Sequence, residues 1–87
     1  MDAERQKELF RQVAAEFING NGFNPELLNS LESSFNTIWS MIFVKFNEAA
    51  RQKEKDFCLT EPEIGTFKNL CHEILQRQRD QRQGLNS

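Results

Sequence analysis

The stretch Ile38–Phe46 reads Ile-Trp-Ser-Met-Ile-Phe-Val-Lys-Phe, with seven apolar side chains among nine residues. It lies in a segment from Pro25 to about Lys55 that has no internal glycine or proline. A segment of that length predicts one helix of roughly eight turns. Because the middle of this helix is apolar on almost every side, we expect it to be buried against more than one neighbour.

Most apolar residues of this predicted central helix lie on one stripe. At about 100° per residue, the stripe covers roughly 120° of the helix surface. Its members are Leu28, Leu31, Phe35, Ile38, Trp39, Ile42, Phe46, Ala49 and Ala50. Leu27, Met41, Phe43 and Val44 lie outside the stripe, and Val44 is nearly opposite it. These four residues form a surplus of apolar surface, which a further helix or a partner would have to bury.

Local signals on the N-terminal side predict a first helix. Asp2 fits its N-cap, and we expect the helix to run to about Asn19. The Asn-Gly steps that follow end it, with Gly20 in a left-handed position after the last turn. Asn24 fits the N-cap of the central helix, and Pro25 its first helical position.

The clearest local signal is Thr60-Glu61-Pro62-Glu63, which has the spacing of a capping box with Thr60 as N-cap and Glu63 at the third helical position. It predicts a third helix that runs to about Arg79. The sequence therefore predicts an all-α fold, a three-helix protomer with a long central helix that associates as a dimer. We expect residues 1–80 to form a single domain, followed by a frayed C-terminal tail at 81–87.

The composition limits the setting of the protein. A chain of 87 residues buries only about 60% of its unfolded surface, so we expect association to supplement its stability. The first residues are polar and do not resemble a secretory signal, and the longest apolar run is too short to cross a bilayer. We therefore expect an intracellular, cytoplasmic protein with reduced cysteines and no membrane partner.

The sequence offers no constellation for catalysis or for a metal. Its soft ligands are Cys58, Cys71 and His72, fewer than the four that a closed zinc site uses. Cys71 and His72 are helix neighbours about 100° apart, so they do not form a nucleophile–base pair. We predict that the protein is not an enzyme and has no catalytic residues, metal or other cofactor.

The surplus apolar surface predicts a non-enzymatic helical protein–protein interaction module. Aromatic and methionine side chains dominate buried anchors at interfaces. The predicted interface residues, on the central helix, are Phe35, Trp39, Met41, Phe43, Val44 and Phe46. The partner would be a second copy or another helical protein, so the chain would act as a homodimer or as a subunit of a larger complex.

The alternative is a small nucleic-acid-associated regulator. Arg77, Arg79 and Arg82 could contact phosphates from the basic end of the third helix, although the net charge of −2 argues against binding driven by bulk charge. The order of a shorter helix, a long central helix and a third helix resembles that of a histone-fold protomer. The resemblance covers element lengths only, and it implies head-to-tail dimerisation through the long helix.

Overall fold

The computed structural model describes residues 2–20 and 22–85, and within them the chain forms helices and no strand. The elements are α1 (Ala3–Asn19), the 3-10 helix η1 (Pro25–Ser30), α2 (Leu31–Lys53) and α3 (Glu61–Leu85). The predicted all-α fold with a long central helix is therefore confirmed.

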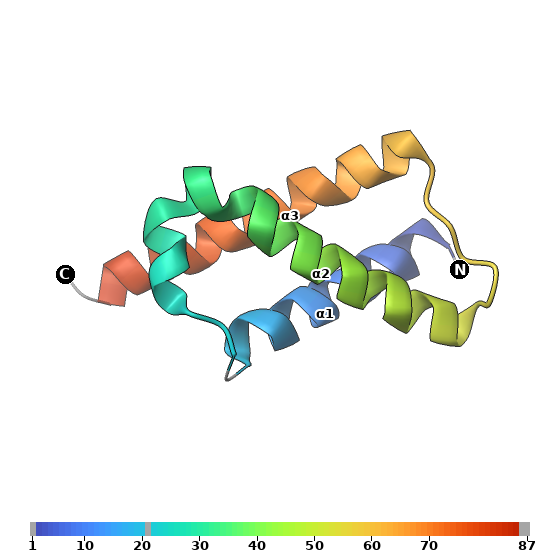
Figure 1. The fold of residues 1–87 in the computed structure, drawn as a ribbon, viewed down its shortest axis with the longest axis horizontal. Helices are drawn as coiled ribbons and strands as arrows, with labels where there is room; N and C mark the ends of the chain where they lie inside the picture. The colour runs from blue at the N-terminus through green and yellow to red at the C-terminus, as the bar shows by residue number, and fades with distance from the viewer. Residues whose placement is uncertain (1, 21, 86–87) are drawn as a thin grey trace.

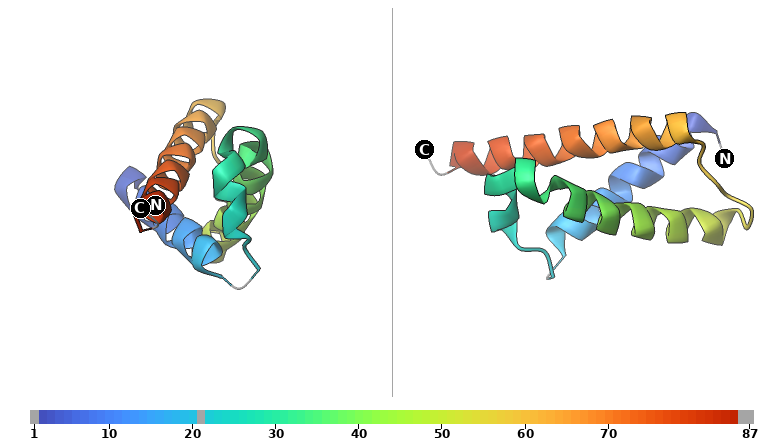
Figure 2. Two further views of the ribbon diagram at one scale, coloured as in Figure 1. Left: turned by 90° about the vertical axis from the view of Figure 1, so that its left-hand side faces the viewer. Right: turned by 45° about the horizontal axis from the view of Figure 1, so that its top comes forward.

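The three α-helices pack against one another around one core. In Figure 1, α2 lies in front of α1 and α3, and α1 crosses behind it. Seen along the long axis in the left view of Figure 2, the helices are arranged as the sides of a rough triangle around the core. Each helix contacts the other two, and η1 contacts both α2 and α3. The side of α2 that faces the viewer in Figure 1 therefore has no helix over it.

The centre of the core is a cluster of phenylalanines, one from each α-helix. The ring of Phe10 on α1 lies 5.3 Å from that of Phe46 on α2 and 5.2 Å from that of Phe67 on α3. Phe46 and Phe67 are also 5.2 Å apart, and Phe57 from the α2–α3 loop meets Phe46 edge-on at 5.7 Å. Aromatic pairs in this distance range stabilise a core beyond the area that they bury.

The start of α1 is as predicted, but its end differs. The Asp2 carboxylate accepts a hydrogen bond from the Arg5 backbone N–H at 2.8 Å, which confirms Asp2 as N-cap. Gly20 has φ −74° and ψ 156°, so the predicted left-handed conformation is wrong. The glycine is suited to this place for another reason: a Cβ there would lie 3.1 Å from the Glu16 carbonyl oxygen.

The predicted single helix from Pro25 to about Lys55 is two elements. Asn24 is an N-cap, because its side chain accepts a hydrogen bond from the Glu26 N–H at 3.0 Å, but the turns that follow are 3-10. The backbone breaks at Ser30, with φ −116° and ψ 44°. Nearby hydroxyls hydrogen-bond locally, as Ser33 Oγ does to the Ser30 carbonyl, and such bonds compete with regular helix.

At the start of α3, half of the predicted capping box forms. A Glu63 carboxylate oxygen accepts hydrogen bonds from the Thr60 backbone N–H at 3.1 Å and from the Thr60 hydroxyl at 2.8 Å. The Thr60 hydroxyl therefore donates to Glu63 instead of accepting from a backbone N–H. At its other end α3 continues past Arg79 to Leu85. The expected fraying of the tail stays a prediction, and residues 86–87 lie outside the described residues.

Candidate interaction surface

The six predicted interface residues do not form one surface. Phe46 has no exposed area, because it packs among the phenylalanines of the core, so it is not available to a partner of the folded protomer. Phe35, Trp39 and Phe43 are half-buried, whereas Met41 and Val44 are exposed. Helix geometry explains the division: Trp39 and Phe43 each lie two positions from Met41, about 200° around the helix.

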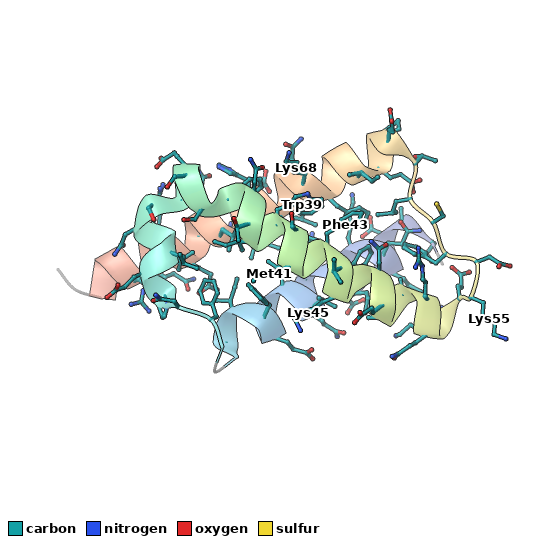
Figure 3. All side chains as sticks on the ribbon, viewed as in Figure 1. Trp39, Met41, Phe43, Lys45, Lys55 and Lys68 are labelled. Atoms are coloured by element: carbon teal, nitrogen blue, oxygen red, sulfur yellow. The ribbon has the colours of Figure 1, made fainter. Side chains whose placement is uncertain are left out.

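The three half-buried aromatic residues pack within the protomer. Trp39 lies 4.9 Å from Phe43 and 6.1 Å from Phe10, measured between ring centroids. Phe35 meets the His72 ring of α3 edge-on at 5.0 Å. Figure 3 shows Trp39 and Phe43 on the α3 side of α2 and Met41 on the α1 side. These three aromatic rings therefore pack against other residues of the same chain, and only part of their surface is left for a partner.

Met41 and Val44 remain as the exposed part of the predicted interface. Their exposed fractions are 51% and 56%, and they are the large apolar side chains that stay exposed within the described part of the chain. They lie one turn apart on α2, beside a shallow hollow of about 420 Å³. The hollow is lined by Ser40, Met41, Val44, Lys45 and Glu48. We call this part of α2 the outward face.

The polar lining of the outward face is what the sequence interpretation missed. Ser40 donates its hydroxyl to the Asn36 carbonyl at 2.8 Å, so its oxygen lone pairs point away from the helix backbone. Lys45 and Glu48 follow Val44 within one turn and bring a charge of each sign to the edge of the hollow. Each of them lies four residues from Met41 or Val44, and this spacing is the signal that could have found them.

The three arginines of the alternative do not gather on one side of α3. Arg79 is only 24% exposed at its side chain, and it pairs with Glu32 of α2 at 3.7 Å and with Asp80 at 4.0 Å. Arg77 and Arg82 are exposed. Arg77 lies about 200° from Arg79 and about 140° from Arg82 around the helix. Nucleic-acid binding at this end stays a prediction, and this placement does not favour it.

The two cysteines lie in different environments. Cys71 is buried on α3, and loss of hydration raises the pKa of its thiol to about 12, so the thiol is protonated at neutral pH. Cys58 is exposed, and its thiol lies 3.7 Å from the Leu59 carbonyl oxygen. Across residues 2–20 and 22–85, no three His, Cys, Asp or Glu side chains are grouped in a way that could hold a metal ion.

Another hollow, of about 500 Å³, lies between α1 and the C-terminal end of α2. It is lined by Arg5, Glu8, Leu9, Gln12, Lys53 and Glu54. Two basic and two acidic residues are among these, and Arg5 also approaches Asp2 at 4.0 Å. The mixture of charges gives this hollow no preference for an anion or a cation.

Comparisons with known proteins found no protein that is similar to this chain. The chain matches no protein-family model, no curated protein sequence and no solved structure. None of the helices described here is long and apolar enough to cross a bilayer.

Proposed function

We propose that this protein is a helical protein–protein interaction module that associates through the outward face of α2. One observation carries the proposal: Met41 and Val44 are exposed side by side on the central helix, whereas the other large apolar residues whose side chains the structure describes are wholly or partly buried. Exposed apolar side chains that lie together mark interaction sites more often than isolated ones do. The role is non-enzymatic, with a second copy or another helical protein as partner.

The surroundings of Met41 and Val44 suit a helical partner. A second helix packs against a ridge of side chains spaced three and four residues apart, and Met41, Val44 and Glu48 have this spacing on the outward face. Methionine adapts its shape to irregular partners. Lys45 and Glu48 border the apolar pair and can form the polar rim that surrounds the centre of an interface.

The test is photo-crosslinking from the outward face in living cells. A photoreactive phenylalanine analogue replaces Val44 in one variant and Glu73, an exposed residue of α3, in the control. We expect a discrete cross-linked product from position 44 and none from position 73. Its mass distinguishes a second 10.2 kDa copy from another protein. Absence of a product from position 44, or equal products from both positions, would overturn the proposed function.

A further inference from the structure

We draw no further inference here: the strongest candidate, the exposed Met41–Val44 pair beside the shallow hollow on the outward face of α2, belongs to the interaction surface already described, and nothing in the structure shows what covers it.

Discussion

On its inner face α2 places Phe46 among three other phenylalanine rings, whereas on its outer face it leaves Met41 and Val44 about half exposed. Both faces are built from apolar residues a few positions apart in the same sequence stretch. The inner face is satisfied by α1, α3 and the α2–α3 loop of the same chain. The comparison shows that apolar side chains on one helix can serve two purposes: those covered internally stabilise the protomer, and those left over are available for association.

The largest difference between the two faces should appear when a core ring is removed. Phe46→Ala is expected to lower the free energy of unfolding by about 3–5 kcal/mol, because it deletes a fully buried ring that contacts Phe10, Phe57 and Phe67. Urea denaturation followed by circular dichroism measures the loss. A change below about 1 kcal/mol would mean that the phenylalanine cluster is not the centre of the core.

Trp39 lies at the boundary between the two faces, so its removal should have an intermediate effect. Trp39→Ala is expected to cost about 2 kcal/mol, less than a fully buried aromatic residue, because the indole is half-buried against Phe10 and Phe43. The same urea titration gives the value. A loss equal to that of Phe46→Ala would place Trp39 in the core and move the boundary of the outward face.

Much of the division of α2 into a buried and an exposed face depends on helical periodicity and on interactions between residues close together in the sequence. The stripe spacing predicted that Leu31, Ile38, Ile42, Phe46 and Ala50 point inward, and all five are buried. The caps at Asp2 and Asn24 depend on side chains within one turn of the backbone groups that they satisfy. Sequence patterns therefore predicted the three helical segments and most of the inner face of α2.

The remaining features depend on how the segments pack. Leu27 and Phe43 are outside the predicted stripe yet partly buried against the core, since η1 turns where one straight helix was expected and α3 covers part of α2. Arg79 was expected to be available for phosphate contact at the basic end of the third helix, but it pairs with Glu32, which is distant in sequence. Helical periodicity cannot show which surplus residues a neighbouring element will cover, so the sequence did not separate the partly buried Phe43 from the exposed Met41 and Val44.

A glycine on the exposed side of α3 should respond to helix propensity alone. Gly65→Ala is expected to stabilise the protein by about 0.8 kcal/mol, because an added Cβ there meets no atom within 4 Å. Gly20→Ala is the matched control: its Cβ would lie 3.1 Å from the Glu16 carbonyl oxygen, so we expect no gain. Thermal denaturation of both variants distinguishes the two environments. Destabilisation by Gly65→Ala would show that this side of α3 is covered.

The exposed N-terminal cap of α3 should contribute less to the stability of the protein than the changes above, and its contribution should depend on pH. Hydrogen bonds from the Thr60 backbone N–H, and then from its hydroxyl, lower the pKa of Glu63 below its ordinary value of 4.5. The stabilisation by ionised Glu63 is therefore complete above pH 4.5 and is lost as the pH falls through the lowered pKa. Thr60→Ala should cost about 0.5 kcal/mol at neutral pH, the lower end for caps, because the backbone donor remains.

Acid titration of stability in the wild type and in Glu63→Gln checks this cap. The variant should lose the part of the acid dependence that begins below pH 4.5, since its amide does not ionise. Identical curves for the two proteins between neutral pH and the acid transition would show that the cap does not form in solution.

The smallest expected effect is on the outward face itself. Val44→Ser should change the stability of the monomer by less than about 0.5 kcal/mol, because Val44 is 56% exposed and serine has a similar helix propensity. If a second copy is the partner, the result should differ at high concentration, since association stabilises only the folded state and raises the melting temperature of the wild type. Val44→Ser should lose that rise while melting like the wild type at low concentration. A loss above about 1 kcal/mol at low concentration would mean that the protomer itself covers Val44 and that both faces of α2 are internal.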